Sequence, residues 1–475
     1  MTHFPILPQS RVTNKTFAFV TRTVPMENNR HISEEIIQRE IESLDSPFDE
    51  IDWSPANNFA FNLSIPKTVY PPREDTDLLA NRIIKLGPGR GRKMLEIGSG
   101  SGAITILAAS LGWNVHACDI NPFAVSATKG NLEQNGFSGI VKEGGIGPEK
   151  FPFEDKFDLV IWNLPYIVSH ANEEFLGPME DAALLDNDLL GLDVRLARCI
   201  KSNQLLTSEG IGIMVCRIQS VKSSYCISHR IWDRMQFEDG EEIVTVCLWE
   251  PYVSSTSLFL KETGSTNQDI LSGDYVERHI YASKQTRGRG RYQRKWESME
   301  KAYAGSWDIS ENESMPPGII QLAAALAVVN ALDNDQLSVK WPNDIMINRK
   351  KIAGVLVESI SSSNKSKVVL GIGINIEGSN SEFDFTYSSL SEIGNYDIHD
   401  LDRVLHINIA NLFELSDNLP PIGINNLISK IEKLVKKYGS PMLNNKEYPN
   451  FKISEEGKLI LGKHLVDEID SIDWV

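Results

Sequence analysis

A turn of small polar residues opens the second half of the chain and could hold a compact polar ligand. The turn, Thr263-Gly264-Ser265-Thr266-Asn267, follows the strand-like run Leu258–Lys261. Hydroxyl and amide side chains at this spacing offer donors and acceptors to a small polar ring, such as a ureido group. The same residues also make a good helix cap, so the turn by itself does not decide between ligand binding and capping.

A loop of arginines and glycines comes next, with the sequence Gln285-Thr286-Arg287-Gly288-Arg289-Gly290-Arg291 followed by Arg294-Lys295-Trp296. Glycine lets such a loop fold around an anion, while guanidinium groups contact carboxylate or phosphate. A nuclear localisation patch or an RNA-binding segment has a similar composition. Both of these usually repeat, and this loop occurs once, so the pattern favours an anion-binding loop.

The third stretch, Val339–Ile345, places a lysine and an aspartate at the end of a strand. Lys340 could neutralise charge that develops at a carbonyl or phosphorus during acyl-adenylate formation, and Asp344 could help to hold the magnesium ion carried by ATP. Two more strands are expected at Lys351–Glu358 and Gly371–Asn375. In the second of them, closely spaced glycines admit a base against the backbone, and the final asparagine can hydrogen-bond it.

The first half carries a separate pattern, typical of nucleotide binding. The run Lys93–Ile97 predicts a buried strand that leads through Gly98-Ser99-Gly100-Ser101-Gly102 into a helix over Ala103–Leu111. Alternate glycines let the backbone approach a ligand, and the amides at the helix start can donate to it. The next strand, Asn114–Cys118, ends in Asp119, whose carboxylate can accept both hydroxyls of a ribose.

An amide-containing motif ends the next expected strand, Phe157–Trp162, with the sequence Asn163-Leu164-Pro165-Tyr166. A planar amide or an exocyclic amine is a poor nucleophile while its lone pair is conjugated. Asn163 and the neighbouring backbone carbonyl could accept its two N–H hydrogens and aim the lone pair at a sulfonium methyl group. Tyr166 could pack on the flat face of the acceptor. The motif therefore predicts methyl transfer to nitrogen.

Length and composition exclude several classes of protein. A chain of 475 residues with 41% apolar content can bury two or three cores. The formal charge of -17 opposes general attraction to phosphate backbones, so no DNA partner is expected. Five cysteines without metal-site spacing predict reduced thiols in the cytoplasm. The longest apolar run, Ile319–Leu332, is too short to cross a bilayer and predicts a core helix rather than a membrane segment.

The chain divides into a series of predicted regions. Residues 1–66 show no clear period apart from one helix around Ser33–Leu44. Residues 67–252 alternate short apolar runs with amphipathic stretches, as in a βαβ sheet, and a stretch rich in Pro, Ser and Thr at Pro251–Ser257 ends this pattern. A new α/β pattern occupies residues 257–420, and residues 421–475 predict a small β domain.

The motifs of the second half resemble the biotin protein ligase family over about Leu258–Glu377, with a weaker match in the C-terminal β domain. The resemblance implies an α+β catalytic domain with an SH3-like β module. It also implies that ATP activates biotin to biotinyl-5′-AMP, which a lysine of a biotin carboxyl carrier protein attacks. Lys340 would be catalytic, and Asp344 would contact magnesium. The biotin and ATP contacts would fall on Ser265, Thr266, Asn267, Gln285, Gly288, Arg289, Gly290, Arg291, Arg294, Trp296, Gly354 and Asn375.

In the first half, Val69–Thr76, Glu96–Gly102, Asp119–Pro122 and Asn163–Tyr166 resemble the HemK-like glutamine methyltransferases that modify peptide release factors, over about Thr68–Trp249. The resemblance implies a Rossmann-like class I methyltransferase that uses S-adenosylmethionine, with Asn163 catalytic. The cofactor would contact Glu96, Gly98, Gly100, Gly102, Asp119 and Asn163. The methyl acceptor would contact Asn163, Leu164, Pro165 and Tyr166.

The chain departs from both families at a few positions. Leu164 stands where the methyltransferases usually have proline, while Arg287 and Gln293 stand where the ligases usually have a small residue and glycine. Alternatives stay open for the first half, which could methylate a nucleic-acid base or be an inactive binding module. A lipoate ligase of similar fold is the alternative for the second half, and the loop with Trp296 argues against it. The methyl acceptor, any coupling of the halves and the oligomeric state stay open.

Overall fold

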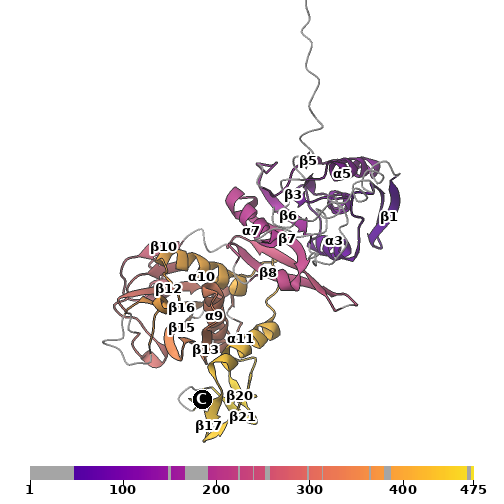
Figure 1. Ribbon diagram of the computed structural model, residues 1–475. Coiled ribbons are helices and arrows are strands. Elements are labelled where there is room, and N and C mark those ends of the chain that lie inside the picture. Colours follow the sequence, from indigo (N-terminus) through magenta and orange to yellow (C-terminus); the bar gives the residue numbers. More distant parts are fainter. Residues whose placement is uncertain are drawn as a thin grey trace, which may run out of the picture. The chain divides into compact units, whose positions relative to one another are not determined.

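The computed structural model describes residues 48–147, 151–165, 191–222, 225–238, 240–251, 257–296, 299–312, 314–362, 365–378, 387–467 and 472–475. The chain forms two compact units: Met1–Val221 with Asp233–Val246, and Lys222–Trp232 with Cys247–Val475 (Figure 1). The helix expected around Ser33–Leu44 and the side chain of Tyr166 lie outside the described residues. No helix in the described ranges is long and apolar enough to span a bilayer.

The first unit is built on a sheet with strand order β5-β4-β3-β6-β7-β9-β8, of which Ser228–Trp232 in β8 and Cys247–Trp249 in β9 are grouped with the second unit. The strands are β3 (Lys93–Ile97), β4 (Asn114–Asp119), β5 (Ile140–Glu143), β6 (Phe157–Asn163), β7 (Leu206–Arg217), β8 (Ser228–Gln236) and β9 (Glu242–Trp249), with helices α3 (Glu74–Leu86), α4 (Ala103–Ser110), α5 (Pro122–Gln134) and α7 (Leu192–Asn203). β3 pairs in parallel with β4 on one side and with β6 on the other. The strand order therefore reverses at β3, and ligands bind at the carboxyl ends of the strands beside such a point.

A hairpin of β1 (Asp49–Ala56) and β2 (Phe59–Ile65) lies in a stretch where the sequence predicted no strand. The side-chain amide of Asn131 on α5 makes two hydrogen bonds to the hairpin. Asn131 Oδ1 accepts from the Ser64 amide at 2.9 Å, and Asn131 Nδ2 donates to the Ser64 carbonyl at 3.1 Å. The same Nδ2 lies 2.9 Å from the carbonyl oxygen of Ser101. The hairpin and the glycine turn after β3 thus share one bracing side chain.

The second unit is built on a mixed sheet with strand order β10-β11-β12-β16-β15-β14-β13. Its strands are β10 (Ser257–Leu260), β11 (His279–Ala282), β12 (Lys301–Asp308), β13 (Leu337–Lys340), β14 (Asp344–Ile347), β15 (Lys350–Ser362) and β16 (Lys365–Glu377), with helices α8 (Thr266–Ser272), α9 (Pro317–Leu332), α10 (Ile398–Phe413) and α11 (Ile424–Tyr438). α9 is apolar on all sides and largely buried, as expected of a core helix. It packs with α10 and against β15, whereas α8 packs on β11, β12 and β16.

The C-terminal stretch, predicted as a small β domain over residues 421–475, begins with the helix α11 and forms small sheets from Pro441 on. Strands β17 (Pro441–Leu443), β18 (Lys446–Glu447) and β22 (Asp473–Trp474) make one sheet, and β19 (Lys452–Ile453), β20 (Leu459–Leu461) and β21 (His464–Val466) make another. Phe451, Leu459 and Leu461 are buried in the same apolar core as α9 and α11. The module therefore packs as part of the second unit.

Candidate active sites

The strand register of the second unit aligns the predicted catalytic lysine with two glycines. Lys340 lies opposite Asp344, Asp344 lies opposite Gly354, and Gly354 lies opposite Gly373 on the next strand. Residues that are directly opposed on antiparallel strands point to the same face of the sheet. The row therefore places a lysine and an aspartate beside a stretch of sheet that carries no side chains.

This bare stretch forms a floor beneath two predicted ligand-binding residues. A Cβ atom at Gly354 or Gly373 would lie 3.1 or 2.8 Å from the indole of Trp296, and one at Gly371 would lie 2.3 Å from Asn267 Oδ1. Only glycine admits such contacts. The indole Nε1 of Trp296 is buried and has no hydrogen-bond partner among the described residues. Trp296 and Asn267 therefore lie directly on this floor, and the indole brings one unused donor to it.

The polar turn is held by contacts other than a side-chain helix cap. Ser265 is the N-cap residue of α8, but its side chain makes no capping hydrogen bond. Instead, Oε1 of Gln285 accepts from the Thr266 amide at 2.9 Å. The side chains of Thr266 and Asn267 are buried and lie 2.7 and 2.6 Å from the hydroxyl of Ser306 on β12. Ser265 therefore does not cap α8 with its side chain.

The arginine–glycine loop is folded back on itself and tied to α8. The Gly290 amide donates to the Arg294 carbonyl at 2.7 Å, and the Trp296 amide donates to the Gly288 carbonyl at 3.0 Å. One Arg289 nitrogen lies 2.8 Å from Gln268 Oε1. The arms of the loop thus come together and place its guanidinium groups next to the helix that begins with the polar turn.

Glu358 joins the loop to the turn, and sequence reasoning did not single it out. Its carboxylate accepts from Asn267 Nδ2 at 2.7 Å and lies 3.4 Å from a nitrogen of Arg289. The sequence showed only a strand that ends near Glu358. Arg287, the departure from the family pattern, is used at the same junction, because its amide donates to the Gly264 carbonyl at 2.8 Å.

Asn375 has the chemistry that adenine recognition requires. Its Nδ2 donates to the Ser388 carbonyl at 3.1 Å, while its Oδ1 is buried without a partner among the described residues. An unsatisfied buried acceptor is costly, so it fits a ligand N–H group better than a purely structural role. Asn375 Oδ1 is therefore a candidate acceptor for a ligand N–H group.

Glycine geometry also marks the candidate site of the first unit. Gly98, Gly100 and Gly102 all have positive φ angles, which favour glycine. A Cβ atom at Gly98 would lie 2.8 Å from the Trp162 indole, and one at Gly102 would lie 2.9 Å from Thr128, so both glycines are needed for packing. At Gly100 the nearest atom is 4.0 Å away. Of the three, Gly100 is therefore the one whose backbone faces open space, where a ligand can approach.

The two acidic residues near this turn are buried and hold it in place. Asp119 accepts from the Gly100 amide at 2.9 Å and from the Asn121 amide at 2.8 Å, and burial raises the pKa of its carboxyl. Burial also raises the pKa of Glu96 to about 8, although a hydrogen bond from Thr105 opposes this. A positively charged ligand beside these carboxyls would favour their ionised forms.

Asn163 lies at the end of β6 with one side of its amide engaged. Its Nδ2 donates to Asp75 Oδ2 at 3.0 Å, and its Oδ1 is buried without a partner among the described residues. Leu164 is buried, and its amide donates to the Val215 carbonyl at 3.2 Å, which fixes the backbone where proline is usual in the resembling family. The motif thus presents an open acceptor, as its predicted chemistry requires.

Comparison with known proteins gives a match to each half. Residues 258–375 match the Biotin/lipoate A/B protein ligase family, and residues 88–246 match a methyltransferase domain. Residues 258–375 form a domain of the biotin/lipoate ligase family. The first match contains the polar turn, the arginine–glycine loop and the row from Lys340 to Gly373, and the second contains the glycine turn and Asn163. The chain therefore carries a ligase domain after a methyltransferase domain, as the sequence predicted.

Relatives of the ligase domain include the Bifunctional ligase/repressor BirA of Bacillus subtilis, 37% identical over 136 residues, which are 26% of this chain and 40% of that protein. The Biotin--[acetyl-CoA-carboxylase] ligase of Paracoccus denitrificans is 33% identical over 129 residues, 25% of this chain and 54% of that protein. Among solved structures, a biotin protein ligase from Aquifex aeolicus in complex with biotin and ATP is 27% identical and covers 46% of this chain and 95% of its own, with a TM-score of 0.36. The chain thus spans 40 to 54% of these curated relatives.

The ligase domain offers one carboxylate, rather than a cluster, for a metal ion carried by ATP. Asp344 lies 2.6 Å from the ammonium group of Lys351, which also sits 5.2 Å above the Trp296 ring. Within the described residues, no group of three His, Cys, Asp or Glu side chains could hold a metal ion. Magnesium bound to nucleotide phosphates often takes only one or two protein carboxylates. The donor set fits an ion that arrives with ATP, since Lys351 pairs with Oδ1 of Asp344 and a carboxylate has a second oxygen for a cation.

Proposed function

We propose that the ligase domain attaches biotin to a lysine of a biotin carboxyl carrier protein through biotinyl-5′-AMP, with ATP as the second substrate. The observation that carries the proposal is the row in which Lys340 lies beside the glycine floor of Gly354 and Gly373. A cation at this position stabilises negative charge that develops as the biotin carboxylate attacks the α-phosphate. Lys340 thus lies in the same row as the glycines on which the Trp296 indole rests.

Each predicted contact has a physical role in this reaction. The polar turn offers buried donors and acceptors to the ureido ring, the guanidinium groups of the loop neutralise phosphate, and Asn375 Oδ1 accepts from the exocyclic amine of adenine. Trp296 walls the biotin pocket, and Asp344 meets the magnesium ion that accompanies ATP. The turn contributes Ser265, Thr266 and Asn267 with Gln285 beside them; the loop contributes Gly288, Arg289, Gly290, Arg291 and Arg294.

Labelling of a carrier domain tests the proposal for the ligase. The purified protein, incubated with ATP, magnesium, biotin and a carboxyl carrier domain, should transfer biotin to one lysine of the carrier, read by intact-mass spectrometry. Lipoate added in equal amount distinguishes the lipoate ligase alternative, because it would then be the acid transferred. Transfer of lipoate alone would overturn the assignment of biotin as substrate.

We propose that the methyltransferase domain transfers a methyl group from S-adenosylmethionine to the side-chain amide of a glutamine in a peptide release factor. The unpartnered Oδ1 of Asn163 supports an N–H donor as the acceptor group. The open backbone at Gly100 and the carboxylate of Asp119 would hold the cofactor, with Glu96 beside them and Gly98 and Gly102 framing the turn. Leu164 and Pro165 would line the acceptor site together with Tyr166.

Cells with and without the gene provide the test for the methyltransferase. Mass spectrometry of the release factor should show a methylated glutamine only when the gene is present, and the same samples report biotin on the carrier protein. Calorimetry with S-adenosylmethionine separates the alternatives: absence of binding would mean an inactive binding module. Cofactor binding together with methylated nucleic-acid bases and an unmodified release factor would mean a base methyltransferase.

A further inference from the structure

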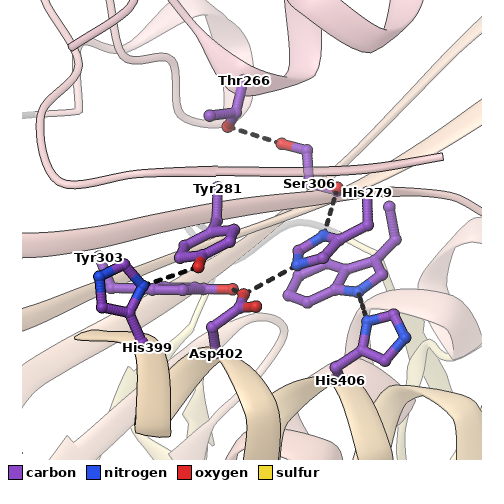
Figure 2. A network of polar contacts seen from close by, with 9 residues as sticks. Thr266, His279, Tyr281, Tyr303, Ser306, His399, Asp402 and His406 are labelled. Carbon is purple, nitrogen blue, oxygen red and sulfur yellow. Dashed lines mark hydrogen bonds and ion pairs between the residues drawn. The ribbon is translucent and has the colours of Figure 1, made fainter. Parts of the chain in front are cut away.

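A buried ion pair lies behind the polar turn, on the opposite face of the ligase sheet. The ring of His279 on β11 is fully buried and stacks on Trp307 with a centroid distance of 4.4 Å. Its Nε2 lies 2.8 Å from Asp402 Oδ1 on α10, and the hydroxyl of Tyr303 donates to the same oxygen at 2.7 Å. Figure 2 shows the strands lying between this cluster and Thr266. The pair therefore joins α10 to β11, the second strand from one edge of the sheet.

The second nitrogen of His279 contacts the backbone of Ser306. Nδ1 lies 2.9 Å from the Ser306 carbonyl oxygen, which can only accept, so Nδ1 must carry a hydrogen. Nε2 lies 2.8 Å from the carboxylate oxygen of Asp402, so both ring nitrogens have a partner. Loss of either partner would leave an uncompensated polar group in the core, where such groups are costly. The orientation of the ring, and with it the Ser306 peptide, is thereby fixed.

Ser306 carries this constraint through the sheet to the polar turn. Successive side chains of a strand point to opposite faces, so the hydroxyl of Ser306 lies on the face away from His279. That hydroxyl is 2.7 Å from Thr266 Oγ1 and 2.6 Å from Asn267 Oδ1. Gly371 lies opposite Ser306 on β16 and leaves room for the amide of Asn267. One serine thus links two residues of the polar turn to the ion pair.

A buried ion pair contributes little stability compared with apolar residues of the same volume, so its clearest contribution is geometric. We propose that His279 and Asp402 are positioning residues for the polar ring of biotin, acting through Ser306 on Thr266 and Asn267; this inference rests on the proposed biotin ligase function. Neither residue touches the substrate. Their loss should therefore weaken the binding of biotin more than the binding of ATP, since Ser306 contacts Thr266 and Asn267 directly, whereas Arg289 of the loop is reached from Asn267 through Glu358.

Calorimetric titration of the full chain with biotin, and separately with ATP, tests the inference. Asp402→Asn keeps the volume and removes the charge, so the Kd for biotin should rise about tenfold, the effect of losing one strong hydrogen bond. Tyr303→Phe removes one hydrogen bond to Asp402 and should act in the same direction, which keeps the test decisive where Asp402→Asn does not fold. Tyr281→Phe is the matched control, because its hydroxyl contacts His399, at 2.8 Å, rather than the pair.

The outcomes separate this inference from the function on which it rests. A wild-type protein that binds biotin, together with folded Asp402→Asn and Tyr303→Phe variants that bind it equally well, would remove the positioning role alone. An equal loss of biotin and ATP affinity would mean general damage to the fold and would also overturn the inference. A wild-type protein that binds no biotin would remove the proposed function and the inference together.

Discussion

Asp75 Oδ2 accepts a hydrogen bond of 3.0 Å from Asn163 Nδ2, and this contact decides which way the Asn163 amide faces. A carboxylate can only accept, so the amide nitrogen must point to Asp75 and the amide oxygen must point away. Asp75 is itself held in the first turn of α3, where its other oxygen accepts from the Thr76 amide at 2.7 Å. The carboxylate thus orients the amide oxygen toward a methyl acceptor.

Asp75→Asn should therefore slow methyl transfer while leaving cofactor affinity nearly unchanged. An amide at position 75 can present its own nitrogen to Asn163 and let that side chain flip, which removes the acceptor from the substrate. We expect kcat to fall by about a hundredfold, as when one oriented hydrogen bond is lost from a transition state. Single-turnover kinetics with labelled cofactor give the rate, and calorimetry gives the cofactor Kd. Asp77→Asn is the control, because Asp77 contacts Trp53 instead; equal rates for wild type and Asp75→Asn would refute this role.

Local patterns predicted the elements that carry the sites, but not the contacts that connect them. The strand Lys93–Ile97 and the glycine turn after it were predicted because a short, mostly apolar run and turn chemistry can be read from neighbouring residues. The hydrogen bond from Asn163 to Asp75 joins residues 88 positions apart, and the one from Ser306 to Thr266 joins residues 40 positions apart. A periodic pattern in the sequence cannot predict contacts at such separations. Glu358 was missed for the same reason, since its role depends on which strands are neighbours.

The hairpin β1–β2 is an element that was not predicted from the sequence. β2 (Phe59–Ile65) alternates regularly, since Phe61, Leu63 and Ile65 are buried between more exposed neighbours, so this strand could have been predicted. β1 (Asp49–Ala56) is less regular near Pro55. Asn131 on α5 and Asn135 just after it bond the hairpin backbone, a contact between distant residues that the alternation does not reveal.

Glu96→Gln should stabilise the methyltransferase domain at neutral and alkaline pH. Below about pH 4.5 the carboxyl is protonated in both the folded and the unfolded chain; as pH rises toward the folded pKa of about 8, the unfolded chain ionises first and unfolding becomes easier. The glutamine variant does not lose stability in this way. The difference in free energy of unfolding between the variant and the wild type therefore grows between pH 4.5 and 8 and is constant above that range. Calorimetric unfolding across that range, with hydrogen exchange of the β3 amides, measures it. A stability difference that does not change with pH would contradict the buried, neutral carboxyl.

Lys340→Ala should remove most biotin transfer without unfolding the ligase domain. The side chain lies at the end of β13 and is only partly buried, so its loss costs little packing, whereas the charge next to Asp344 and the glycine floor is lost. We expect adenylate formation to slow by about a hundred- to a thousandfold. Pyrophosphate release measures this step directly. Lys350→Ala is the matched control, because Lys350 begins β15 and pairs with Glu392 at 3.8 Å; full activity of Lys340→Ala would exclude a catalytic role for that lysine.

Gly373→Ala should fill the space between β16 and the Trp296 ring with a methyl group. The new methyl group would lie 2.8 Å from the Trp296 ring, so the indole must move away from the sheet or the strand must shift. Affinity for biotin should fall about tenfold, and tryptophan fluorescence of the free protein should change because the indole loses its buried position. The same substitution in a Trp296→Ala background should add little further loss, since the clashing ring is gone. Gly423→Ala is the control, because its Cβ would meet only Asn426 at 3.9 Å. An undiminished additional loss in the Trp296→Ala background would show that the floor acts on the ligand independently of Trp296.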